Sequence, residues 1–165
     1  RNSGKIIWRW GPDNSVGHPH SVESLDNGNI LFFDNGLHRN SAERGASEIS
    51  ASRVLEVNPK TNKVEWEYHD PDAPSFYSPI CSGNQRLPNG NTLICEATKG
   101  RFFEVTPDKE IVWEYFTPFS IPRPSYFGWT LGRTVFQAHR YGVDYPGLQG
   151  RQLIPSRFKW VLQEA

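Results

Sequence analysis

Residues 25–31 read LDNGNIL and residues 87–93 read LPNGNTL, an offset of 62 positions. An Asn-Gly pair between apolar runs is a strong short-range signal for a β-hairpin, because both turn residues take positive φ angles. Two further stretches recur in the same order: RVLEVNP (53–59) returns as RFFEVTP (101–107), and VEWEY (64–68) returns as IVWEY (111–115). Repeats of this length are typical of propellers and solenoids.

Each repeat predicts four strands. A hairpin is followed by an alternating third strand and by an outer strand with Trp and Tyr on one face, and no stretch has convincing helical periodicity. The predicted strands lie at about 20–25, 29–34, 52–58 and 63–68 in the first repeat and at about 83–87, 91–97, 101–106 and 110–116 in the second. The predicted fold class is therefore all-β, with radially repeated four-stranded blades that cover most strand edges.

Parts of two more blades flank these repeats. Residues 6–10, IIWRW, copy only the closing strand, and residues 134–141 look like the start of another blade. We therefore expect a partial β-propeller over residues 1–148, with two complete blades and edge strands of two others, followed by a tail at 149–165. The remaining blades are expected upstream of residue 1 or, failing that, on a second chain.

The composition argues against several classes of function. Lys plus Arg and Asp plus Glu number 18 each, so no net charge attracts nucleic acid or an anionic membrane. The longest apolar run, at 29–33, is too short to span a bilayer. Cys81 and Cys95 flank one predicted hairpin; a single bridge is conceivable, but we expect two free thiols. No cofactor is predicted, and the histidines lack the spacing of a metal site.

One insertion distinguishes the two repeats. Leu25 and Trp66 are 41 positions apart, whereas Leu87 and Trp113 are 26 apart, and the extra 15 residues fall around 37–51. Because this polar insertion leaves the repeat intact, we expect it to loop out over one face, where function is often located.

The first hairpin is expected to bring polar residues together at the mouth of this insertion. If its Asn-Gly pair forms a two-residue turn, paired positions sum to 55. Ser21 then lies opposite Asp34, and His20 lies opposite Asn35.

These residue types suit the transfer of an anionic group. Histidine can act as a nucleophile or proton carrier near neutral pH. Arg39, which follows within the insertion, carries a guanidinium that matches the planar oxygens of a sulfate or phosphate. We predict a site centred on His20, with Asn35, His18, Arg39 and the channel-lining His139 as substrate-binding residues.

The second repeat provides an internal control. A shift of 62 positions turns three residues of the cluster into others: His20 into Ser82, Asp34 into Glu96 and Asn35 into Ala97. The second repeat thus keeps the scaffold and loses the cluster, which would be odd if the cluster served folding alone.

Four stretches together resemble the C-terminal part of arylsulfotransferase-like proteins. They are HSVESLDNGNILFFDNGLHR (20–39), SRVLEVNPKTNKVEWEY (52–68), QRLPNGNTLICEATKGRFFEVTPDKEIVWEY (85–115) and AHRYGVDYPGL (138–148). The resemblance covers about residues 1–148 and implies a six-bladed propeller, typically periplasmic or secreted.

The resemblance also implies a reaction. Enzymes of this family pass a sulfuryl group from an aryl sulfate to a phenol through a sulfated histidine, without a nucleotide donor. His20 corresponds to that catalytic histidine, and the other anion-holding histidines and arginine are expected in blades upstream of residue 1. One position departs from the pattern, because Pro19 stands where we expect Gln.

Structural interpretations stay open for each of these residues. His20 can be a satisfied residue at a strand start, Asp34 and Asn35 can bond the backbone of a turn, Arg39 can be a solvated loop residue, and His139 can pack within a strand. The alternative function is a non-catalytic extracytoplasmic propeller that binds a partner or acts as a scaffold. A quinone-dependent dehydrogenase is disfavoured, because no Trp-docking motif recurs at fixed blade positions and no metal-ligand set is present.

Overall fold

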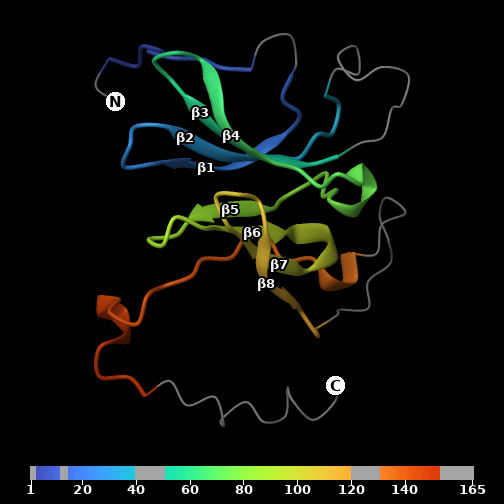
Figure 1. The fold of residues 1–165 in the computed structure, drawn as a ribbon, viewed down its shortest axis with the longest axis vertical. Coiled ribbons are helices and arrows are strands. Elements are labelled where there is room, and N and C mark those ends of the chain that lie inside the picture. The colour runs from blue at the N-terminus through green and yellow to red at the C-terminus, as the bar shows by residue number, and fades with distance from the viewer. Residues whose placement is uncertain (1–2, 12–14, 40–50, 120–130, 153–165) are drawn as a thin grey trace.

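The chain forms two four-stranded antiparallel sheets, one after the other along the sequence (Figure 1). The structure is a computed structural model that describes residues 3–11, 15–39, 51–119 and 131–152. The first sheet contains β1 (Pro19–Ser24), β2 (Ile30–Asp34), β3 (Arg53–Asn58) and β4 (Lys63–Tyr68), and the second contains β5 (Gly83–Arg86), β6 (Thr92–Glu96), β7 (Arg101–Val105) and β8 (Ile111–Phe116). Single-turn 3₁₀ helices occur at η3 (Ala73–Ser75), η4 (Ala97–Lys99), η5 (Leu131–Arg133) and η6 (Pro146–Leu148).

The all-β class and the eight predicted strands are confirmed, and strand order in each sheet follows chain order. Residues 6–10 and 134–141, all described, form no strand within this chain, and their pairing with strands of other blades stays a prediction. A strand needs a neighbour to complete its ladder of hydrogen bonds. Within the described part of this chain residues 134–141 make only isolated backbone bonds, from the amide of Val135 to the carbonyl of Ala97 and from the amide of Ser82 to the carbonyl of Phe136. Residues 40–50 of the predicted insertion and 153–165 of the tail lie outside the described residues.

The main hydrophobic core lies between the two sheets. Leu31 and Phe33 of β2 face Ile94 of β6 and Phe103 of β7, and all four side chains are buried. Phe76, from the connection between the sheets, is fully buried among rings from both. Burial of such side chains is the main source of stability in a small all-β unit.

The other face of the first sheet is covered by the N-terminal segment. Phe32 of β2 packs edge-on against Trp10, with ring centroids 5.8 Å apart. The indole nitrogens of Trp8 and Trp10 both donate to Asn62 in the turn between β3 and β4. Because both faces of β2 are covered, its sequence is a continuous apolar run rather than an alternating one.

The hairpin between β1 and β2 differs from the predicted two-residue turn. The amide of Leu25 bonds the carbonyl of Asn29, and the amide of Gly28 bonds the carbonyl of Leu25, each at 2.9 Å. This is a three-residue loop with Gly28 at φ +83° in the left-handed region, a common hairpin type. The predicted register is therefore wrong: His20 pairs with Phe33, and a bulge follows His20.

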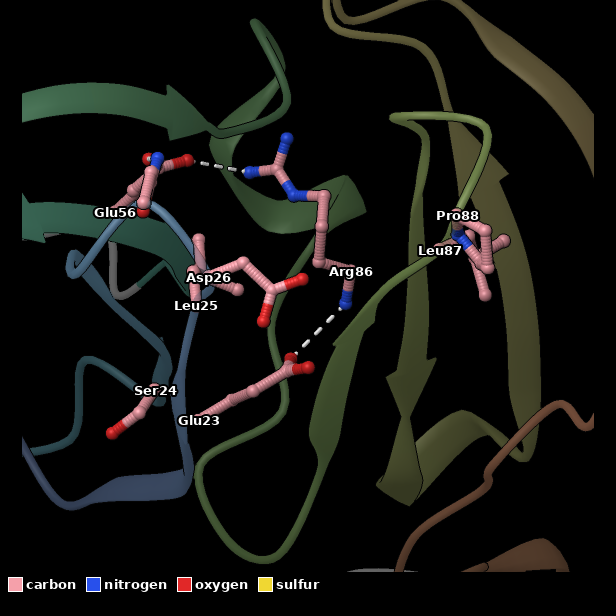
Figure 2. A pocket seen from close by; sticks show the side chains of 9 residues that line it. Glu23, Ser24, Leu25, Asp26, Glu56, Arg86, Leu87 and Pro88 are labelled. Atoms are coloured by element: carbon pink, nitrogen blue, oxygen red, sulfur yellow. Dashed lines mark hydrogen bonds and ion pairs between the residues drawn. The ribbon is translucent and has the colours of Figure 1, made fainter.

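A charged clamp joins the first sheet to the second (Figure 2). Arg86 of β5 donates from Nη2 to Glu56 Oε2 of β3 at 2.7 Å. Its guanidinium also lies over the ring of Trp66, 5.1 Å from the centroid. A guanidinium suits both partners, because it pairs with carboxylates and stacks on aromatic faces.

The same clamp recurs one unit further along. Arg140 pairs with Glu104 of β7 and lies over the ring of Trp113 of β8, 4.9 Å from its centroid. Arg140 therefore occupies on the second sheet the place that Arg86 occupies on the first. Residues 134–141 thus sit where another repeat would begin, although they form no strand.

Candidate functional site

The candidate site lies at the start of β1, at the end of the first sheet opposite the hairpin. Two glycines bring the chain segments together there. The amide of Gly36 donates to the carbonyl of Gly17 at 2.9 Å. Gly36 has φ +79°, and a Cβ at this position would overlap the carbonyl of Ala51. Only glycine allows this conformation and this close approach together.

Asp34 organises the loops around this crossing. Its carboxylate is fully buried and accepts four hydrogen bonds. Oδ1 takes the amides of Gly17 and Gly36 at 2.8 and 3.2 Å, and Oδ2 takes Arg39 Nη1 and Arg53 Nε at 2.7 and 2.8 Å. A buried charge is tolerated when it is paired and bonded in this way. Asp34 therefore has a structural role, as the turn interpretation expected. It bonds the backbone of two loops and two arginine side chains rather than the backbone of a single turn.

Arg39 lies inside the protein rather than in solvent. Its side chain is 7% exposed, Nη1 bonds Asp34, and Nη2 bonds the carbonyl of Ala51 at 2.7 Å. These two contacts and the low exposure of the side chain leave the guanidinium little surface that a sulfate could reach. These contacts give Arg39 a structural role. They support neither the predicted contact with a substrate nor the alternative of a solvated loop residue.

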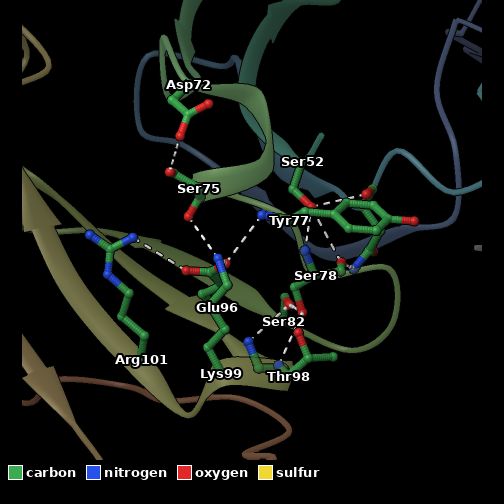
Figure 3. Close-up of polar contacts among 12 residues, drawn as sticks. Ser52, Asp72, Ser75, Tyr77, Ser78, Ser82, Glu96, Thr98, Lys99 and Arg101 are labelled. Atoms are coloured by element: carbon green, nitrogen blue, oxygen red, sulfur yellow. Dashed lines mark hydrogen bonds and ion pairs between the residues drawn. The ribbon is translucent and has the colours of Figure 1, made fainter. Parts of the chain in front are cut away.

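The second sheet repeats the carboxylate and its arginine (Figure 3). Glu96, fully buried at the end of β6, accepts from Arg101 Nη1 at 3.3 Å, from Lys99 Nζ at 2.6 Å and from the amide of Tyr77 at 3.1 Å. Arg101 is the cross-strand partner of Glu96, just as Arg53 is of Asp34. This part of the polar cluster therefore belongs to the repeated scaffold.

His20 and Asn35 are what the first repeat adds to that scaffold. Nδ1 of His20 lies 2.7 Å from Asn35 Oδ1 and 3.0 Å from the carbonyl oxygen of His18. Asn35 is fully buried, and its Nδ2 donates to the carbonyls of Ser78 and Cys81 at 2.5 and 2.9 Å. The two side chains thus meet although the strand register differs from the predicted one.

A network of hydroxyl groups holds the connection that carries these carbonyls (Figure 3). The amide of Ser78 donates to Ser52 Oγ at 2.9 Å, and Ser52 Oγ donates to the carbonyl of Asn35 at 2.9 Å. Ser82 Oγ donates to Ser78 Oγ at 2.8 Å, and the amide of Thr98 donates to the same oxygen at 3.1 Å. Asn35 is therefore bonded to a connection that several hydrogen bonds hold between the two sheets.

Phe136 is a neighbour of His20 that the sequence analysis missed. The two rings meet edge to face with centroids 6.5 Å apart, and Phe136 is 65% exposed. Gln137 Nε2 donates to Ser21 Oγ at 3.1 Å, which fixes the segment beside β1. Counting back from Arg140 and Arg86, Phe136 corresponds to Ser82, the residue before Gly83, and Gly83 occupies in the second sheet the place of His20 in the first. Equivalent positions of the first two repeats and of the segment that follows them therefore lie close together here, which only the repeat alignment of this last segment could have revealed.

The other predicted histidines lie near the rim of the site or beyond it. His18 is exposed, and its ring meets that of His38 edge to face at 5.2 Å, while its carbonyl supports His20. His139 is exposed and, within the described residues, makes neither a ring contact nor a hydrogen bond with His20. No group of three His, Cys, Asp or Glu side chains in the described ranges could hold a metal ion.

Neither cysteine competes with His20 as a nucleophile. Cys81 and Cys95 are free thiols, half-buried and buried. Burial raises the pKa of Cys81, and it raises the pKa of Cys95 to about 12, with the neighbouring Cys81 and Glu96 adding to the effect. Because the thiolate is the reactive form, both are poor nucleophiles at neutral pH.

A second cleft, at the other end of β1, is separate from this site (Figure 2). It measures about 390 Å³ and is lined by Glu23, Asp26, Glu56, Arg86 and Leu87, among others. Glu23 accepts the amide of Arg86 at 3.0 Å, and Glu56 accepts its guanidinium. The charges in this cleft therefore serve mainly to join the sheets.

The fold and the site together define an all-β repeat protein in which the imidazole of His20 is bonded through Nδ1 to a buried amide at the junction of the two sheets. The chain belongs to the arylsulfotransferase (ASST) family, whose family model matches residues 6–117. A search of curated proteins finds no match to this chain.

Two solved structures are similar to part of this chain. A protein of unknown function from Bacteroides caccae is 17% identical with a TM-score of 0.43, over 61% of this chain and 32% of that one. Virginiamycin B lyase from Staphylococcus aureus is 19% identical with a TM-score of 0.39, over 65% of this chain and 28% of that one. The chain thus spans about a third of the length of these proteins. In the ranges that the structure describes, no helix is long and apolar enough to cross a membrane.

Proposed function

We propose that this chain supplies the nucleophile of a sulfuryl-transferring propeller, with His20 as the catalytic residue. An imidazole lone pair attacks the sulfur of an aryl sulfate, the N–S bond forms, and the S–O bond breaks with its electrons leaving on the aryl oxygen. A phenol oxygen then attacks the sulfur, the N–S electrons return to the ring, and the phenol proton passes to solvent. Splitting one transfer into two steps in this way is the general logic of covalent catalysis.

The observation that carries the proposal is the setting of the His20 ring in a chain of this family. All five histidines are described, and His20 alone has a ring nitrogen bonded to a side chain, the buried amide of Asn35. The exposed ring of Phe136 beside it offers an apolar surface that suits an aryl group.

The remaining groups of the site are proposed to come from further repeats. Negative charge on the sulfuryl oxygens needs fixed donors, and Arg39 is already bound to Asp34. We therefore assign the two sheets to two blades of a six-bladed ring, whose other blades supply the cations. An extracytoplasmic location, typical of the family, is part of the same proposal.

Turnover of a chromogenic aryl sulfate with a phenol acceptor tests this function in the full-length protein. His20→Gln should lower transfer by about 10³-fold or more, while His69→Gln, the matched change at an exposed histidine, should leave it unchanged. If the wild-type protein transfers nothing, the function fails and a binding or scaffold role takes its place.

A further inference from the structure

We propose that Asn35 fixes His20 as its Nδ1–H tautomer and thereby makes Nε2 the nitrogen that reacts. Asn35 is then a positioning residue rather than the substrate-binding residue expected from the sequence. The reaction named here rests on the proposed function, but the tautomer does not.

The orientation of the Asn35 amide follows from its neighbours. One end of the amide faces the carbonyl oxygens of Ser78 and Cys81 at 2.5 and 2.9 Å. Carbonyl oxygens only accept hydrogen bonds, so this end must be the NH₂ group. The flipped amide would set an oxygen against two oxygens in a fully buried place and lose both bonds. The amide oxygen is therefore the end that faces His20.

The position of the proton on the His20 ring follows from the orientation of this amide. Both neighbours of Nδ1, the Asn35 amide oxygen at 2.7 Å and the His18 carbonyl oxygen at 3.0 Å, are acceptors. A neutral imidazole carries one N–H, and only a proton on Nδ1 satisfies these oxygens. Nε2 then holds the lone pair, and it makes no hydrogen bond with any described residue.

This arrangement suits both halves of the transfer. When Nε2 takes the sulfuryl group, the proton on Nδ1 stays in place and the ring becomes a cation. The amide oxygen stabilises that cation but is too weak a base to remove the proton. When the phenol attacks, the ring therefore leaves as neutral imidazole, a much better leaving group than an imidazolate anion.

The assignment also links the site to the packing of the two sheets. Ser78 and Cys81 lie in the connection between β4 and β5, and the hydroxyls of Ser52 and Ser82 hold that connection. Cys81 and Ser82 have φ of +55° and +79°, so this backbone takes a conformation that non-glycine residues rarely adopt. The orientation of Asn35, and with it the tautomer of His20, depends on the second sheet being in place.

The direct test is ¹⁵N NMR of the imidazole in the wild-type chain above neutral pH, with His20→Gln to assign the ring. The expected spectrum has the proton on Nδ1 and a lone-pair nitrogen at Nε2. A proton on Nε2, or comparable amounts of both tautomers, would overturn the inference. Since no substrate is present, this result is independent of whether the protein transfers sulfuryl groups.

Removing the amide separates positioning from simple structural support. In Asn35→Ala the Nδ1–H loses its closer acceptor, so the ¹⁵N spectrum should show a substantial fraction of the tautomer with its proton on Nε2. Asn58→Ala removes an amide at the far end of β3, where Asn58 Oδ1 accepts the amide of Lys60, and should leave the His20 tautomer unchanged. An Nδ1–H tautomer that persists alone in a folded Asn35→Ala protein would contradict the inference; if that variant does not fold, the wild-type spectrum decides.

Discussion

Replacing Phe76 by alanine should remove the side chain that joins the two sheets. Phe76 is fully buried, and its ring centroid lies 5.5 Å from Phe33, 5.4 Å from Tyr68 and 5.6 Å from Phe103. Truncating a buried phenylalanine to alanine removes its buried apolar area and leaves a cavity, and this lowers the free energy of unfolding by about 3–5 kcal/mol. Three edge-on partners, each worth about 0.5–1.5 kcal/mol beyond its buried area, favour the upper part of that range.

Two further variants calibrate this value. Phe76→Leu keeps most of the apolar volume but loses the ring contacts, so its cost should be about 1–2 kcal/mol. Phe116→Ala makes the same chemical change on the outer strand β8, where the side chain is 49% exposed, and should cost less than about 1 kcal/mol.

Equilibrium urea unfolding, followed by tryptophan fluorescence, measures all three changes in the free energy of unfolding. The reasoning predicts the order Phe76→Ala, then Phe76→Leu, then Phe116→Ala, from most to least destabilised. If Phe76→Ala costs no more than Phe116→Ala, the sheets do not pack through Phe76 as described.

Three more outcomes follow from the same structure. Burial raises the pKa of Tyr68 to about 12, so the unfolded chain loses the phenol proton first and stability should fall as pH rises from about 10 to 12; urea titrations should show a smaller fall in Tyr68→Phe. Asp34→Asn should cost about 3–5 kcal/mol, because two buried arginine contacts lose their charge, and Glu96→Gln should behave alike; denaturation midpoints near that of wild type would contradict this. Phe136→Ala should raise KM for an aryl sulfate several-fold, with kcat little changed, since its exposed ring would contact the aryl group; steady-state kinetics with an unchanged KM would exclude that contact.

The strands were predictable because their signals are local. Asn-Gly turns and the alternation in residues 53–57 each depend on only a few consecutive residues, and such signals predicted all eight strands of the structure. The register of β1 was not, because the same Asn-Gly pair also fits a three-residue loop, and the bulge at Ser21, with φ +54°, has no sequence signal. The turn alone therefore cannot determine which residues face each other beyond it.

The candidate site was predictable only in part. His20 and Asn35 adjoin one hairpin, so their approach could be expected from the chain alone. The role of Arg39 could not, because it depends on the burial of Asp34 by loops from three segments. Phe136 reaches His20 across 116 positions of sequence, and the carbonyls that orient Asn35 come from the connection to the second sheet. Such contacts are properties of the packed repeats.

The central claim, sulfuryl transfer through His20, is tested most directly by trapping the intermediate. The full-length protein is mixed with an aryl sulfate without acceptor, quenched, digested and examined by mass spectrometry. The account predicts one SO₃ group on the peptide that contains His20, localised to its imidazole and lost when a phenol is added before the quench. An enzyme that turns over the aryl sulfate but carries no such group, or carries it on another residue, would contradict the account.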